Sequence, residues 1–163
     1  MQGLPQIIEL SAAFIVLMLA SVWDIRQRRI PNAVTFPAIL LGLTLTGIFK
    51  LGSMPLTIAV LVLLFFFGTL NLMGQGDVKL IMALVAICGA SVALISAGLA
   101  AIIIVGVQLL LYPKETVSDV KNALSALITT DFKRINKEGR TVPFAPYILT
   151  GFTILVVYQL LYL

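Results

Sequence analysis

The stretch that decides the fold is Leu80–Leu111, LIMALVAICGASVALISAGLAAIIIVGVQLLL, a run of 32 residues without a charged side chain. A helix that spans a bilayer needs roughly 17–25 apolar residues, because the hydrocarbon holds no water to satisfy backbone polar groups. The run is too long for one crossing and tight for two. We therefore expect two helices, one or both of them short or tilted, with a turn at Gly89-Ala90-Ser91.

Four other apolar segments surround this run. They are Ile7–Trp23, Ala33–Phe49, Pro55–Met73 and Val142–Leu163, and Glu9 is the one charged residue within them. Over the whole chain 60% of residues are hydrophobic and 11% are charged, whereas soluble domains carry roughly 25% charged residues. This composition excludes a soluble globular protein, a disordered chain and a nucleic-acid binder. The predicted fold is an all-α, polytopic membrane protein: one domain over residues 1–163, with a bundle of about six transmembrane helices.

The basic residues predict how the chain is oriented in the bilayer. Ten of the eleven Lys and Arg residues lie in 26–29, at Lys79 and in 113–141. A chain with six spans has all three of these regions on the same side of the membrane. Because such residues mark cytoplasmic loops, we expect a multi-pass protein of the inner (plasma) membrane with both termini and Lys50 outside. In loop 113–141 apolar residues recur at helical spacing over about 117–128. This pattern predicts an amphipathic helix on the inner leaflet or a helix that docks the substrate.

The scarcity of reactive residues limits the chemistry. The chain has no His and one cysteine, Cys88, which excludes a Ser-His-Asp triad, a Cys-His dyad, a His-ligated metal and an internal disulfide. We expect no cofactor and no metal, and we expect Cys88 to be a small buried residue. Four of the seven acids lie among basic residues of the polar loop, and Glu9 is expected at the outer interface. The four are Glu115, Asp119, Asp131 and Glu138.

The two remaining acids, Asp24 and Asp77, adjoin apolar helices at the same predicted side of the membrane. Asp24 follows the first span, in a helix expected to continue to Pro31 because proline disfavours helical geometry in the residue before it. One interpretation is structural. Asp24 would pair with Arg28 one turn later, and Asp77 would stabilise the start of the fourth span. Gly74 and Gly76 would then be turn residues.

The other interpretation is a pair of facing carboxylates. A charged residue at membrane depth is costly and indicates function, and two carboxylates about 3 Å apart share one proton. The ionised member can remove a proton from water while the protonated one polarises a carbonyl group. Amide hydrolysis then needs neither His, Cys nor a metal ion, and glycines beside the pair permit close approach of an extended substrate.

Three motifs resemble those of the type IV prepilin peptidases and cover most of the chain. Asp24-Ile25-Arg26 followed by Arg29-Ile30-Pro31-Asn32 resembles the first aspartate motif of that family. Gly74-Gln75-Gly76-Asp77-Val78-Lys79 resembles the second, the GxGD motif. Val142-Pro143-Phe144-Ala145-Pro146 resembles a Pro-Phe-Gly-Pro element before the last helix, with Ala145 where the family commonly has glycine.

The resemblance implies an intramembrane aspartic endopeptidase that removes the leader of prepilins and pseudopilins at the cytoplasmic face. It implies Asp24 and Asp77 as the catalytic pair and Gly74 and Gly76 as part of the motif that presents Asp77. The other residues that match motif positions have no role derivable from the sequence: Arg26, Pro31, Asn32, Lys79, Pro143, Phe144 and Pro146. The expected partners are a prepilin and the lipid bilayer, and the oligomeric state is not predicted.

Three alternatives stay open at this point. A non-catalytic assembly subunit and a small proton-coupled transporter would also carry paired intramembrane carboxylates, although neither explains the glycines or the third motif. An archaeal preflagellin-type peptidase would share the two aspartate motifs. Because the chain has a single cysteine and starts almost directly with its first span, it looks like the short form associated with tight-adherence (Flp) pili. The resemblance therefore does not carry methyltransferase activity over.

Overall fold

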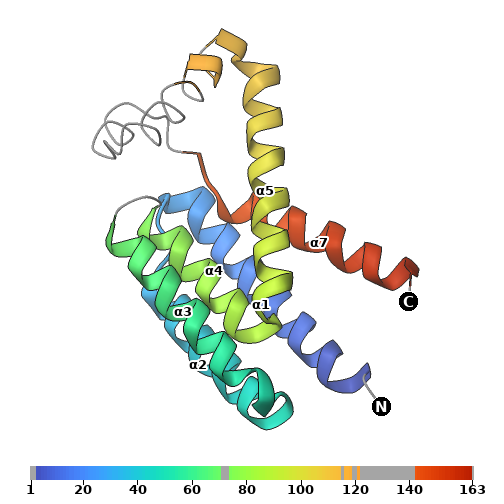
Figure 1. The fold of residues 1–163 in the computed structure, drawn as a ribbon. Coiled ribbons are helices and arrows are strands. Elements are labelled where there is room, and N and C mark those ends of the chain that lie inside the picture. The colour runs from blue at the N-terminus through green and yellow to red at the C-terminus, as the bar shows by residue number, and fades with distance from the viewer. Residues whose placement is uncertain (1–2, 71–73, 115, 119–120, 122–141, 163) are drawn as a thin grey trace.

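The computed structural model describes residues 3–70, 74–114, 116–118, 121 and 142–162. Within these residues the chain is all-α and its main helices form one bundle (Figure 1). They are α1 (Gly3–Gln27), α2 (Asn32–Phe49), the short 3₁₀ helix η1 (Leu51–Ser53), α3 (Met54–Thr69), α4 (Gln75–Cys88), α5 (Ala90–Leu111) and α7 (Ala145–Tyr162). The all-α class predicted from hydropathy is confirmed.

The core of the bundle surrounds α4, which packs against α1, α2, α3 and α5 and lies between α1 and α3 in Figure 1. Nine of its 14 residues are buried. By contrast, α3 buries only Thr57 and Leu61 and exposes large apolar side chains on its other faces. Exposed apolar faces of this kind suit contact with lipid, where burial in protein brings little further gain.

Small residues let the helices approach closely. A Cβ atom added at Gly42 of α2 would lie 2.5 Å from the backbone carbon of Ala86 in α4, and one added at Gly151 of α7 would lie 2.6 Å from the Ser96 carbonyl oxygen in α5. Both distances are shorter than side chains tolerate. The α2–α4 and α5–α7 contacts are therefore backbone-to-backbone, as is common between membrane helices.

Two sharp turns set the direction of the helices. Arg28 adopts φ of 50°, a left-handed conformation that ends α1 at Gln27, so the first helix stops before the expected boundary at Pro31. Pro31 then provides the extended residue that precedes α2. Gly89 adopts φ of 89° between α4 and α5, a conformation that glycine adopts without a steric penalty. The expected turn within the run 80–111 lies there.

Helix lengths agree with a membrane protein. Four segments are long and apolar enough to cross a bilayer: Gly3–Gln27, Asn32–Phe49, Leu51–Thr69 and Ala90–Leu111. The apolar part of α7 is shorter, and α4 has 14 residues, as the tight fit of two helices into 80–111 requires. Of the amphipathic helix expected over about 117–128, residues 117, 118 and 121 are described and helical; the rest lies outside the described residues.

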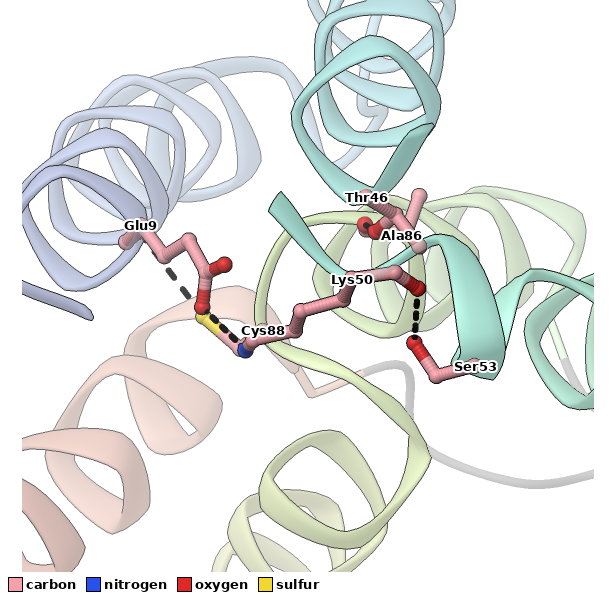
Figure 2. Close-up of polar contacts among 6 residues, drawn as sticks. All are labelled: Glu9, Thr46, Lys50, Ser53, Ala86 and Cys88. Carbon is pink, nitrogen blue, oxygen red and sulfur yellow. Dashed lines mark hydrogen bonds and ion pairs between the residues drawn. The ribbon is translucent and has the colours of Figure 1, made fainter. Parts of the chain in front are cut away.

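A polar cluster lies at the end of the bundle that contains Glu9. It is formed by Glu9, Thr46, Lys50, Ser53 and Cys88 (Figure 2). Lys50 donates to Glu9 Oε2 over 2.6 Å, and the Glu9 side chain is 3% exposed. Thr46 Oγ1 donates to the Ala86 carbonyl at 2.9 Å, and the Cys88 thiol lies 3.8 Å from the Glu9 carbonyl oxygen. Glu9 is therefore enclosed by protein, and its partner Lys50 directly follows α2.

Candidate functional site

Asp24 lies on the buried face of α1, one turn before the helix ends. The buried residues of this face include Glu9, Ala13, Leu17, Ala20 and Asp24. Their spacing of three and four positions keeps them in one line along the helix. Asp24 is 5% exposed, so its carboxyl group points into the bundle and not toward lipid or water.

The Asp24 carboxyl group contacts the first residue of α7. The backbone N–H of Ala145 donates to Asp24 Oδ2 at 2.9 Å, and this bond is buried. The first N–H groups of a helix have no partner within the helix and need an acceptor from outside it. Asp24 supplies that acceptor from a residue 121 positions earlier in the sequence. The third motif is thereby joined to the first.

Asp77 lies in the first turn of α4, at the end of the bundle where α1 ends and α7 begins (Figure 1). Its side chain is half-buried. The negative charge of Asp24 acts on the Asp77 carboxyl group, so the two acids are close enough to interact electrostatically. The structure thus brings together the two carboxylates that the sequence singled out.

Gly74 leaves space for the Asp77 carboxyl group in its present position. A Cβ atom at Gly74 would lie 2.7 Å from Asp77 Oδ2, too short for an unstrained contact. The backbone of Gly74 has φ of −54°, which any residue adopts, so a side chain here would act by displacing the Asp77 carboxyl group and not by straining the backbone. At Gly76 an added Cβ would lie 3.6 Å from the nearest Ile30 atom, an ordinary van der Waals distance.

Substitution of Gly74 by alanine is therefore expected to move the Asp77 carboxyl group. We expect Gly74→Ala to lower the rate of any reaction at this site by about tenfold or more, which corresponds to about 1.4 kcal/mol. The unfolding midpoint should change little, because the displaced atom is the end of a side chain. Gly76→Ala is the matched control and should cost less activity. Equal losses in the two variants, measured as initial rates, would contradict the steric argument.

A second contact holds the α1–α2 turn against α4. Lys79 Nζ donates to Asn32 Oδ1 at 2.9 Å and lies 5.7 Å from the centre of the Phe36 ring, a distance at which a cation–π attraction operates. Ile30, which is buried, lies against Gly76. The sequence alone suggested no role for Asn32 or Lys79. Here their hydrogen bond joins the first motif to the second.

The remaining motif residues shape the ends of helices. Pro31 precedes α2, and the Phe144 carbonyl accepts the N–H groups of Tyr147 and Ile148 at the start of α7. Pro143 directly precedes Phe144, and Pro146 is the second residue of α7. Arg26 is exposed in the last turn of α1. Phe144 and Pro146 flank Ala145, the residue whose N–H binds Asp24.

Comparison with known protein families gives a direct result. The model of the type IV leader peptidase family matches residues 11–110, a range that contains both Asp24 and Asp77. This chain belongs to the type IV leader peptidase family. No match was found among curated proteins or among solved structures.

Membership in the type IV leader peptidase family assigns a general activity and setting. The family implies a leader peptidase role, and together with the apolar helices it indicates a membrane protein. The matched range ends before the Val142–Pro146 element. The contact between Ala145 and Asp24 therefore comes from the structure and stands apart from the family match.

Proposed function

We propose that this leader peptidase is an aspartic endopeptidase that cleaves type IV prepilins or pseudopilins. The observation that carries the proposal is the pair of acids at one end of the bundle, where Asp24 interacts electrostatically with Asp77. No helix other than α1 and α4 has a charged side chain among the main helices of the described chain. Within these helices, the end of the bundle with Asp24 and Asp77 is therefore the place where two carboxyl groups available for hydrolysis lie together.

A shared proton on the pair is enough to hydrolyse a peptide bond. The ionised carboxylate takes a proton from water, whose oxygen attacks the carbonyl carbon, while the protonated carboxyl group gives its proton to the carbonyl oxygen. The tetrahedral diol then collapses. The C–N bond breaks, the first acid gives its proton to the leaving nitrogen, and the second recovers a proton from a diol hydroxyl group. The pair returns to its starting state with one proton.

The location of the pair supports cleavage near the membrane surface. Asp77 is half-buried in the first turn of α4, near an end of the bundle where water can reach the reacting bond. The basic residues 26–29 and Lys79 lie in the sequence beside the two acids, and such residues mark the cytoplasmic side. We therefore propose cleavage at the cytoplasmic face of the inner membrane, with both termini on the opposite side.

The direct test is co-expression with a candidate prepilin, followed by electrophoresis. Removal of the leader increases the mobility of the substrate, and we expect this change only when the peptidase is present. A transporter or an assembly subunit would leave the mobility unchanged with every prepilin or preflagellin tested. Cleavage of a preflagellin in preference to prepilins would move the substrate assignment to the archaeal-type alternative.

The pH dependence of cleavage should follow the shared proton. As the pH rises far enough to ionise both carboxylates, no proton remains to polarise the carbonyl group and activity falls. At low pH both acids are protonated, no base remains, and activity falls again. The two midpoints belong to the pair and not to either residue. Initial rates in detergent across the pH range in which the protein stays folded measure this, and a constant rate into alkaline pH would contradict it.

A further inference from the structure

We propose that the two acids have different and fixed roles: Asp24 is the ionised member that takes the proton from water, and Asp77 carries the shared proton and donates it to the carbonyl oxygen. This assignment rests on the proposed function and adds to it. The asymmetry comes from α7, which reaches one acid of the pair and not the other.

The start of α7 directs one donor at Asp24. Ala145, its first residue, donates its N–H to Asp24 Oδ2 at 2.9 Å. Pro146, the second residue, has no N–H, and the N–H of Tyr147 binds the Phe144 carbonyl. Among the first three residues of α7, the N–H of Ala145 is therefore the one donor directed away from the helix, and its acceptor is the acid on α1.

A hydrogen bond of this kind favours the ionised form of its acceptor. Bonds from an N–H to a carboxylate are shorter and roughly twice as strong as bonds between neutral groups. Within the described part of the chain, no hydrogen bond reaches the Asp77 carboxyl group. Both acids lie at the N-terminus of a helix, Asp24 at that of α7 and Asp77 at that of α4, so the helix dipoles act on both. The hydrogen bond is what distinguishes them.

Among the described residues, the charges on the elements that carry the pair are few. On α1 the charged residues are Glu9 and Arg26 besides Asp24, and on α4 they are Asp77 and Lys79. Glu9 is 15 residues from Asp24, at the opposite end of the bundle, and is paired with Lys50. Lys79 donates to Asn32, and Arg26 is exposed. Arg28 and Arg29 are exposed in the α1–α2 turn, while α2, α3, α5 and α7 have no charged side chain.

Burial acts against the assignment and must be outweighed. Asp24 is 5% exposed and Asp77 is half-buried, and burial penalises the charged form of an acid. A buried N–H donor compensates a carboxylate for the hydration that it loses. A buried carboxylate without a donor bears the full cost of desolvation. We infer that the N–H of Ala145 supplies this compensation to Asp24, whereas Asp77 avoids the penalty by keeping the proton.

The first experiment removes the donor without changing the side chains. Replacing Ala145 by its α-hydroxy analogue converts the N–H into an ester oxygen. The same change at Tyr147 is the matched control, because it removes an N–H from α7 that binds within the helix. We expect the ester at 145 to raise the pH of the acid-side midpoint of cleavage by about one unit and the ester at 147 to leave it in place. An unchanged midpoint at 145, or equal shifts at both positions, would overturn the assignment.

The second experiment does not depend on activity. The chain has four aspartates, so carboxyl-labelled aspartate gives a simple carbon NMR spectrum in which each single variant removes one signal. We expect Asp24 in the Asp77→Asn protein to titrate at lower pH than Asp77 in the Asp24→Asn protein. The reverse order would overturn the roles. If both variants still cleaved prepilin, the proposed function would fail instead, and the two failures are therefore distinguishable.

Discussion

Asp24→Asn and Asp77→Asn are each expected to abolish cleavage while the protein still inserts and folds. Acid–base groups contribute roughly 10²–10⁴-fold to a rate, and asparagine keeps the shape of the side chain but can neither accept nor release the proton. Asp24→Asn keeps an oxygen that can accept the N–H of Ala145, so the contact with α7 can persist. The measurement is the rate of leader removal at equal amounts of membrane-inserted protein.

The control for these variants is Asp119→Asn, which removes an acid from the polar segment 113–141 and should leave cleavage unchanged. Because the two acids act as a unit, the double variant should be no slower than either single variant. Cleavage at near wild-type rate by either single variant would remove that residue from the mechanism. If the rate losses of the two single variants multiply in the double variant, the two acids have independent roles and do not share a proton.

The second large effect is expected at the opposite end of the bundle. Lys50→Met should destabilise the fold by about 2–3 kcal/mol, because it leaves the Glu9 carboxylate in the protein interior without its cation. Loss of one partner of a fully buried pair costs about 3–5 kcal/mol. A smaller figure applies here because the Lys50 side chain is 45% exposed and the Glu9 side chain is 3% exposed.

The Glu9–Lys50 contact is tested by a double-mutant cycle. Glu9→Gln combined with Lys50→Met removes the charge together with its partner, and we expect this protein to recover most of the lost stability. The measurement is the thermal unfolding midpoint in detergent, with the four proteins compared under one condition. If the double variant is as unstable as Lys50→Met alone, the loss comes from packing of the lysine side chain and not from an unpaired carboxylate.

Much of the fold was predictable because hydropathy reports directly on membrane crossing. The uncharged run 80–111 required two helices of which at least one is short or tilted. The break falls at Gly89, the glycine with positive φ, and α4 is the short one. Counting crossings also placed Asp24 and Asp77 at the same end of the bundle, because two predicted spans separate them. That argument needs only composition and order along the chain.

Contacts between distant residues were not predictable in the same way. Hydropathy reports how deep a residue lies along a helix, but not which neighbouring helix it faces. Glu9 was expected near the outer interface, but hydropathy did not show that it lies on the buried face of α1 with Ala13, Leu17 and Asp24. The bonds of Ala145 to Asp24 and of Lys79 to Asn32 depend on how the helices pack. For the same reason, the sequence alone could not predict the contact between Asn32 and Lys79.

The short central helix has a consequence for access to the Asp77 carboxyl group. With 14 residues and 1.5 Å per residue, α4 is about 21 Å long, whereas the hydrocarbon layer of a typical bilayer is about 30 Å thick. Its 25-residue neighbour α1 is long enough to span the full layer, and α4 is enclosed by α1, α2, α3 and α5, so the missing length is surrounded by protein. Where the shortfall falls at the Asp77 end, it is lined by these neighbouring helices and not by lipid. A polar leader segment would then reach the carboxyl group without crossing hydrocarbon.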